Sequence, residues 1–235
     1  MVIPGHFSSS HSLFVTSNGD IYIDDGQNNG RIQKWTATTN EFVTVMNVES
    51  TCAGLFVDTN DTLYCSMFLN HRVVKRSLND PNISSIIVAT GTGGQGLNLN
   101  QLNGPAGIFV DVNFDLYVAD CQNHRVQLWH SGEASGITVA GRGSPNPIIA
   151  LRSPTAIVLD AQKYLFIVDR DNHRIVGSGS NGFRCLVGCY EQGLKFNQLN
   201  YPLSLSFDRS GNIFVADADN HRIQKFLYLE KSCGE

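Results

Sequence analysis

Short apolar runs alternate with turn-forming segments along almost the whole chain. The runs are rich in Val, Ile, Leu and aromatic residues, whereas the segments between them are rich in Asn, Asp, Gly and Ser, which favour tight turns. In residues 55–66, for example, an apolar run ends in Asp58, a turn follows, and a second apolar run begins at Leu63. No window has the 3.6-residue periodicity of a helix of useful length. The pattern therefore predicts an all-β fold built of hairpins.

The second run of each hairpin leads into a repeated polar motif. In its fullest form the motif is an apolar run ending in Asp, then any two residues, then Asn-His-Arg, and then another apolar run. Its five copies lie in residues 21–35, 63–75, 116–129, 165–176 and 213–226. One copy has Met67 in place of the Asp, and another is one residue longer and has Gly30 in place of the His. The repeated arginines are 41, 53, 49 and 48 residues apart, and four short strands per unit of this length predict a β-propeller with one antiparallel sheet per blade.

The repeat organises residues 1–235 into a single domain. We expect its blades at residues 12–50, 53–104, 106–153, 155–202 and 204–235. The fifth unit has no fourth apolar run, because the chain stops soon after Phe226. Met-Val-Ile-Pro-Gly at residues 1–5 resembles Ile-Thr-Val-Ala-Gly at residues 137–141, so residues 1–11 are a candidate for a strand that closes the ring from the N-terminus.

The Asn-His-Arg motif after an apolar-Asp turn resembles the NHL repeat. Four copies of Asn-His-Arg in phase carry this resemblance, which extends from about residue 13 to residue 226. It implies a propeller domain similar to those of tripartite-motif proteins, but without their RING part, whose Cys and His spacing the chain lacks. NHL propellers usually have six blades. Five copies therefore leave two alternatives, a closed five-bladed ring or an incomplete six-bladed one.

The motif residues recur in every blade, which favours a structural role over a catalytic one. Asp120 and Arg125 stand at the two ends of a tight loop and are close enough to pair across it. The Asn is a good turn residue, and the His is placed either to donate to a loop carbonyl or to pack against the neighbouring blade. The residues assigned to this structural motif are Asn70, His71, Arg72, Asp120, Asn123, His124, Arg125, Asp169, Asn172, His173, Arg174, Asp217, Asn220, His221 and Arg222.

The cysteines are too scattered for a zinc module. Cys52 and Cys65 flank a predicted hairpin and are placed to face each other across it. Cys185 and Cys189 cannot bridge along a straight strand, but they can do so if a turn at Gly188 brings them together. Two disulfides would indicate an oxidising compartment, whereas buried free thiols are the alternative.

Composition and charge limit the kinds of molecule that the protein is expected to bind. With 17 basic and 21 acidic residues the formal charge is −4, which makes nucleic acid an unlikely ligand. No apolar run is long enough to span a membrane, and the start lacks the pattern of a signal peptide. We expect either a cytoplasmic protein or, in preference, an extracellular or cell-surface piece of a longer chain.

The sequence favours a binding module over an enzyme. We expect a monomeric, non-catalytic scaffold that recognises a protein, or another ligand, through loops on the propeller face. One alternative is the substrate-recognition propeller of a larger ubiquitin ligase. Another is an enzyme similar to propeller lyases and lactonases, whose metal ligands surround the central channel. No convincing catalytic or metal-ligating set is visible in the sequence, so neither a cofactor nor a metal is expected.

Overall fold

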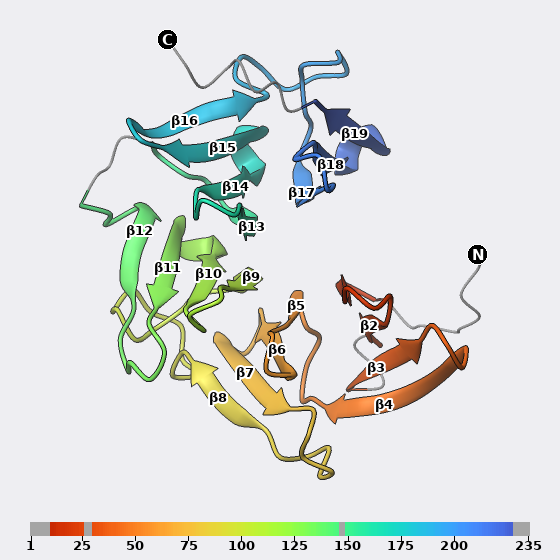
Figure 1. The fold of residues 1–235 in the computed structure, drawn as a ribbon. Helices are drawn as coiled ribbons and strands as arrows, with labels where there is room; N and C mark the ends of the chain where they lie inside the picture. The colour runs from red at the N-terminus through yellow and green to blue at the C-terminus, as the bar shows by residue number, and fades with distance from the viewer. Residues whose placement is uncertain (1–9, 26–29, 146–148, 228–235) are drawn as a thin grey trace.

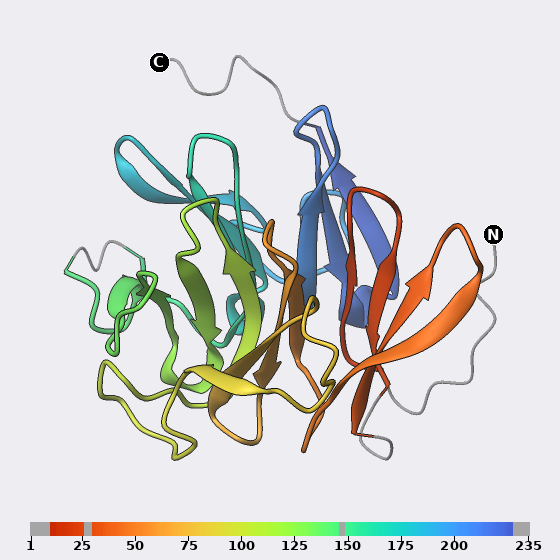
Figure 2. The same cartoon turned by 60° about the horizontal axis from the view of Figure 1, so that its bottom comes forward.

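The computed structural model describes residues 10–25, 30–145 and 149–227, which form five antiparallel sheets arranged around a common axis (Figures 1 and 2). Blade I contains β1 (Leu13–Val15), β2 (Ile21–Asp24), β3 (Arg31–Thr36) and β4 (Glu41–Asn47). Blade II contains β5 (Gly54–Val57), β6 (Thr62–Met67), β7 (Arg72–Ser77) and β8 (Ile87–Thr90). Blade III contains β9 (Pro105–Val110), β10 (Leu116–Asp120), β11 (Arg125–Trp129) and β12 (Ile137–Gly141). Blade IV contains β13 (Pro154–Leu159), β14 (Leu165–Asp169), β15 (Arg174–Gly179) and β16 (Gly182–Val187). Blade V contains β17 (Pro202–Phe207), β18 (Ile213–Asp217) and β19 (Arg222–Phe226).

The predicted fold class is confirmed. Each blade is a meander in which consecutive strands are neighbours, with the first strand nearest the axis. In blades III, IV and V a single 3₁₀ turn joins the second strand to the third: η1 (Cys121–Asn123), η2 (Arg170–Asn172) and η3 (Ala218–Asn220). Blade V has three strands among the described residues, as its sequence indicates. The candidate closing strand at the N-terminus falls almost entirely on residues 1–9, which lie outside the described part of the chain.

Four apolar clusters hold successive blades together. Side chains alternate along each first strand, so Leu55 and Val57 pack toward blade I while Phe56 between them packs toward blade III. The Phe56 ring lies 4.9 Å from that of Phe14 and 5.1 Å from that of Phe109, which links the first strands of three blades. Fully burying one such side chain stabilises the fold by roughly 1.5–3 kcal/mol. Because both faces of an inner blade are covered, its first two strands are apolar at most positions.

The two blades at the ends of the series each have one uncovered face. Leu13 on β1 is 63% exposed, whereas its counterpart in blade II, Leu55, is 6% exposed. Ile223 on β19 is 68% exposed, whereas its counterpart in blade IV, Ile175, is completely buried. We call these two faces the seam. Within the described residues, β17 and β1 are not packed together to the extent seen for the other successive first strands.

Both predicted disulfides are present. The bond between Cys52 and Cys65 joins the segment before β5 to β6, with a Cα–Cα distance of 5.2 Å and both residues completely buried. The bond between Cys185 and Cys189 spans 5.6 Å between Cα atoms and closes the turn after β16, where Gly188 has a φ of +71°. Cys121 is a buried free thiol.

Candidate binding face at the linkers and repeat loops

The Asp, Asn and Arg of the repeat form one hydrogen-bonded cluster at the loop between the second and third strands. In blade III, Asp120 and Arg125 are register partners at the ends of β10 and β11. Arg125 Nε donates to Asp120 Oδ2 over 2.6 Å, and Asn123 Nδ2 donates to the same oxygen over 2.8 Å. The same bonds recur with Asp169, Asn172 and Arg174 in blade IV and with Asp217, Asn220 and Arg222 in blade V, at 2.7–2.9 Å.

The repeated His of blades II, III and IV connects its blade to the next one. It follows the 3₁₀ turn in the left-handed conformation, with φ of +57° at His124, and its Nδ1 accepts the backbone N–H of Ser153 over 3.0 Å. His71 accepts from Gly104 and His173 from Tyr201 in the same way, each over 3.1 Å. An accepting Nδ1 requires the neutral ring with its proton on Nε2. The His173 ring also packs edge-on against Tyr201. The sequence predicted either this packing or a hydrogen bond from the His to a loop carbonyl. The packing is observed, and in its hydrogen bond the His173 ring is the acceptor.

The entries to blades III, IV and V are therefore each held by two blades at once. The residue just before the His-bound one donates its N–H to the repeat Asp of the blade being entered. Asn103 donates to Asp120 Oδ1 over 2.7 Å, and Arg152 to Asp169 and Asn200 to Asp217 over 2.6 Å each. We call each pair of adjacent N–H groups, with the Asp and the His that accept them, an interblade clip.

The Asp residues of two similar clusters have pKa values shifted in opposite directions, because the clusters are buried to different degrees. Burial raises the pKa of Asp120, even though Arg125, Asn123 and the Asn103 N–H favour its charged form. The pKa of Asp217 lies below its usual value. Burial acts to raise it, but the hydrogen bonds that this carboxylate accepts outweigh burial; the donors are Asn200, Asn220, Arg222 and Gln224. The blade III cluster is the more deeply desolvated of the two.

The same Arg and Asn side chains hold the linkers that lead into blades III and V. Beyond its bond to Asp120, Arg125 donates to the carbonyls of Leu97, Asn98 and Gln101 at 2.9–3.1 Å. In blade V, Arg222 donates to the carbonyls of Leu194, Lys195 and Gln198 at 2.7–3.1 Å. Asn123 and Asn220 each add one more bond, to the carbonyls of Gly96 and Gly193 respectively. The backbone of both linkers is thereby fixed beside the repeat loops.

Large apolar side chains project into solvent from these fixed linkers. Tyr190 is 85% exposed and Phe196 is 84% exposed in the linker from blade IV to blade V, and Leu194 lies exposed between them. The linker from blade II to blade III exposes Leu97 and Leu99. Exposed aromatic side chains on an ordered backbone are typical of binding surfaces rather than of cores. We call the surface formed by the two linkers and the repeat loops the linker face.

A small apolar hollow of about 130 Å³ adjoins the exposed tyrosine. The disulfide at the end of β16 forms one wall, and the last residue of β19 forms another. Its lining residues are Leu186, Val187, Gly188, Cys189, Tyr190, Asn197 and Phe226. A hollow of this size accommodates one apolar side chain.

Blades I and II depart from the repeat, and their contacts change accordingly. Met67 is buried where the other blades have Asp, and Arg72 pairs instead with Glu49 at the surface, over 2.6 Å. In blade I, Arg31 pairs with Asp25 over 2.6 Å, but no interblade clip forms because Gly30 has no side chain. A Cβ at Gly30 would lie 2.7 Å from the Val48 carbonyl oxygen, so glycine is required there by close packing.

Two acidic features were not identified as functional from the sequence. In blades II to V the Asp that follows the first strand stabilises the next turn: Asp58 Oδ1, for example, accepts the N–H groups of Asn60 and Thr62 over 2.9 Å each. The signal was present, since a run ending in Asp precedes a turn in four of the five repeats. On that side of the molecule a depression of about 460 Å³ lies between blades I and II, lined in part by Asp20 and Asp58.

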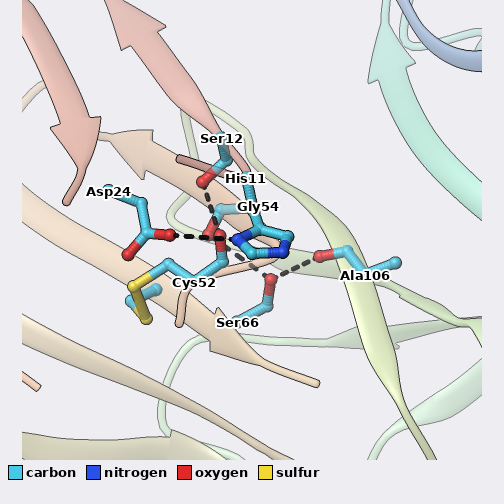
Figure 3. Close-up of a disulfide and its surroundings, with 8 residues drawn as sticks. His11, Ser12, Asp24, Cys52, Gly54, Ser66 and Ala106 are labelled. Carbon is cyan, nitrogen blue, oxygen red and sulfur yellow. Dashed lines mark hydrogen bonds and ion pairs between the residues drawn. A yellow bond between two sulfur atoms is a disulfide. The ribbon is translucent and has the colours of Figure 1, made fainter. Parts of the chain in front are cut away.

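The second feature is a buried carboxylate beside the Cys52–Cys65 disulfide (Figure 3). Asp24 is completely buried, and backbone groups of His11 and Cys52 lie close enough to its carboxylate to favour the charged form. The half-exposed His11 places Nδ1 3.8 Å from Asp24 Oδ2. Burial raises the pKa of Asp24. Asp24 occupies the repeat position held by Ala119 in blade III, so the repeat itself does not reveal it.

No group of three or more potential metal-ligating residues occurs among the described positions. Within the same residues, no helix is long and apolar enough to cross a membrane.

The fold and the recurring cluster define a β-propeller whose blades carry one loop motif. An NHL repeat model matches residues 199–226, which form the last linker residues and blade V. The same arrangement of Asp, Asn, His and Arg is present in blades III and IV. The chain is a β-propeller, and its residues 199–226 match the NHL repeat. No curated protein matches the sequence.

Solved propellers share the fold at low sequence identity. A Bacteroides thetaiotaomicron auxiliary nutrient binding protein is 14% identical, with a TM-score of 0.71, covering 95% of this chain and 60% of that one. A streptogramin B lyase is 11% identical, with a TM-score of 0.63 and coverage of 95% and 70%. A chain of a nidogen–laminin complex is 17% identical, with a TM-score of 0.69 and coverage of 91% and 74%. This chain thus spans about 60% of the length of the nutrient binding protein.

Proposed function

We propose that this propeller is a non-catalytic binding module that recognises a protein partner through the linker face. The observation that carries the proposal is the exposure of Tyr190 and Phe196 on a linker whose backbone Arg222 and Asn220 hold in place. A preordered loop loses little conformational entropy when it binds, so its aromatic side chains contribute most of their burial energy to affinity. The nutrient binding protein and the nidogen–laminin complex among the structural neighbours support a binding role.

The proposal is tested by removing the exposed aromatic side chains. The double variant Tyr190→Ser, Phe196→Ser is compared with Val112→Ser, which removes a similarly exposed apolar side chain from a turn between the first two strands of blade III, away from the linker face. Partners are captured from an extracellular extract on the immobilised protein and identified by mass spectrometry. We expect the captured protein to be lost with the double variant and retained with Val112→Ser.

Thermal unfolding of both variants serves as the control for folding. Exposed substitutions of this kind change stability by about 0.5 kcal/mol or less. Equal capture by all three proteins would contradict the proposal, as would equal loss from both variants at unchanged stability.

The enzyme alternative has a separate test. One of the structural neighbours is a lyase, which is the reason to test it. Metal analysis of the purified protein would overturn the non-catalytic assignment if it found zinc or calcium at one equivalent per chain. In the ubiquitin-ligase alternative, the captured partner would be ubiquitinated by a complex that supplies a RING domain.

We further propose an extracellular or cell-surface location. Its support is the pair of disulfides, which persist in oxidising compartments. Mass spectrometry of the native protein without reduction is expected to show both bonds, and four free thiols would instead favour the cytosol.

A further inference from the structure

The Cys185–Cys189 disulfide lies in a turn that two other blades form without a disulfide. In blade IV this turn follows β16 and has Gly188 at a φ of +71°. Blades II and III make the same turn at Gly91 and Gly141, with φ of +83° and +80°, and neither turn contains a cysteine. In all three blades a Cβ on the glycine would lie 2.2–2.6 Å from the carbonyl oxygen of the repeated His, so close packing against that oxygen fixes the turn. The disulfide is therefore an addition to a turn that does not require it.

The disulfide anchors the segment that carries Tyr190. Residues 189–192 neither donate nor accept a hydrogen bond within the described part of the chain, and the next hydrogen-bonded residue is Gly193. Phe196 lies beyond that point, in the part of the linker whose carbonyls Arg222 holds. The order of Tyr190 thus depends on the disulfide, whereas the order of Phe196 depends on Arg222.

The two disulfides differ in their access to an attacking thiolate. Cys52 and Cys65 are completely buried, whereas Cys189 is exposed and Cys185 is partly exposed. Exchange requires a thiolate to reach the attacked sulfur, so exposed disulfides are the labile ones. The sequence separation is 4 for the exposed pair and 13 for the buried pair, and a shorter loop constrains the unfolded chain less. The exposed bond can therefore open while the fold is retained.

The free cysteine among the described residues is not suited to attack this bond. Cys121 is buried, and burial raises the pKa of its thiol to about 11. Only a small fraction of such a thiol is ionised near neutral pH, and the thiolate is the nucleophile. An attacking thiolate therefore has to come from another molecule.

We propose that Cys189 is a thiol-exchange site through which a small thiol compound controls the order of Tyr190. The thiolate attacks Sγ of Cys189 and forms a mixed disulfide with it, while the bond to Cys185 breaks. The electron pair of that bond stays on Cys185 Sγ, which leaves as a thiolate and takes up a proton from water. A second molecule of the same thiol can remove the adduct as its own disulfide, which leaves Cys185 and Cys189 as two thiols.

Opening the bond is expected to weaken binding at the linker face. Residues 189–192 lose their anchor, so Tyr190 has to be ordered again when a partner binds, and that ordering reduces affinity. This consequence rests on the proposed function, because only there is Tyr190 a contact residue. The exchange at Cys189 itself does not rest on it.

The exchange is tested by locating adducts on the folded protein. The natural chain and the variant Cys233→Ser, which removes the cysteine outside the described residues, are incubated with glutathione. Remaining thiols are then blocked by alkylation, and the adduct is located by mass spectrometry. We expect glutathione on Cys189 in both proteins, an intact Cys52–Cys65 bond, and an unchanged circular dichroism spectrum.

Limited proteolysis with chymotrypsin, which cleaves after aromatic residues, measures the release of Tyr190. Cleavage after Tyr190 is expected to become about tenfold faster when the bond is opened, because the protease acts on the open population of the segment. Cleavage after Phe196 is the internal control and should not change, since Arg222 still holds that part of the linker. The double variant Cys185→Ser, Cys189→Ser should show the faster rate without glutathione.

Several outcomes would overturn the proposal. They are the absence of an adduct on Cys189, equal opening of both disulfides, four free thiols before glutathione is added, and an unchanged rate of cleavage after Tyr190. Opening without added thiol in the natural chain but not in Cys233→Ser would also overturn it, because the attacking thiolate would then be the chain's own.

The result can be separated from that of the proposed function. Adduct mapping and proteolysis need no partner, so both hold even if capture through Tyr190 and Phe196 fails. If a partner is captured equally by the closed protein and by Cys185→Ser, Cys189→Ser, the proposed function stands and its control by thiols is excluded.

Discussion

At the scale of single residues, the repeated motif divides its work among three kinds of side chain. The Asp collects donors, the Arg pairs with it and fixes the linker carbonyls, and the His accepts an N–H from the next blade. A buried ion pair of this type is costly to break by removing one partner, because the remaining charge is left in a poorly solvated site. Blade II, where Met67 replaces the Asp, shows how the same Arg behaves without a buried acidic partner.

Arg125→Ala is expected to destabilise the protein by about 3–5 kcal/mol, because Asp120 stays buried without its partner and three linker carbonyls lose a donor. Arg72→Ala is the matched control. Its partner Glu49 is exposed, so a loss of only about 0–1 kcal/mol is expected. Urea unfolding of the two variants measures both values. Equal losses would contradict the role given to the buried pair.

Protonation of His173 is expected to weaken the fold in mild acid. Burial lowers the pKa of His173 in the folded protein below its ordinary value of 6.5. The unfolded chain therefore takes up the proton first, so this contribution to stability is complete above about pH 6.5 and is lost as the pH falls toward the lower folded pKa. The bond from Tyr201 to Nδ1 is broken when the ring is charged on both nitrogens.

Thermal unfolding between pH 7.5 and pH 5 tests this expectation. His173→Asn removes the titration while tolerating the positive φ, and it should flatten the pH dependence. His221→Asn is the control, because His221 has no backbone donor among the described residues. An unchanged pH profile in His173→Asn would rule out the clip as its source.

At the scale of elements, the strands and the disulfides followed from the sequence because they depend on local patterns. Apolar runs separated by turn residues located the hairpins, and the hairpin geometry brought Cys52 and Cys65 together. The pairing of Asp120 with Arg125 was also visible, since both lie at the ends of one loop. The bond between His71 and Gly104 was not visible, because it joins residues 33 positions apart through the packing of two blades. The exposure of Phe196 was equally hidden, since the pattern of its linker does not show which side faces solvent.

The glycine at the end of the fourth strand in blades II, III and IV offers a test at this scale. In Gly141→Ala the new Cβ would lie 2.3 Å from the His124 carbonyl oxygen, so the strand end must move. In Gly132→Ala the φ is similarly positive, at +87°, but the Cβ would meet nothing within 4 Å. The positive φ alone costs about 1–2 kcal/mol. Gly141→Ala is therefore expected to lower the free energy of unfolding by clearly more than Gly132→Ala, and equal effects would contradict the steric account.

At the scale of the whole molecule, stability is distributed unevenly around the axis. Blades II, III and IV are covered on both faces, whereas blades I and V each leave one face at the seam. In repeat structures each unit is stabilised by its neighbours, so a unit with one neighbour opens more readily than a unit with two.

Native-state hydrogen exchange is expected to show this gradient. Amides of β10 and β11 in blade III should exchange slowest, and those of β1 and β19 should exchange faster. The physical reason is the exposure of Leu13 and Ile223 compared with their buried counterparts in the inner blades. Uniform protection across all five blades would instead indicate that the seam is closed in solution.

The two acceptors of each interblade clip are synthesised at different times. Gly104 bonds to His71, which precedes it in the chain, whereas its neighbour Asn103 bonds to Asp120, which follows. On the ribosome, a finished blade therefore displays an acceptor before the next blade exists, and the emerging linker can attach to it at once. At about 5–20 residues per second, successive blades are delivered roughly 2–10 s apart, which is ample for one hairpin sheet to form before the next arrives. The propeller is thus suited to assembly by accretion during translation, each blade serving as the template for its successor.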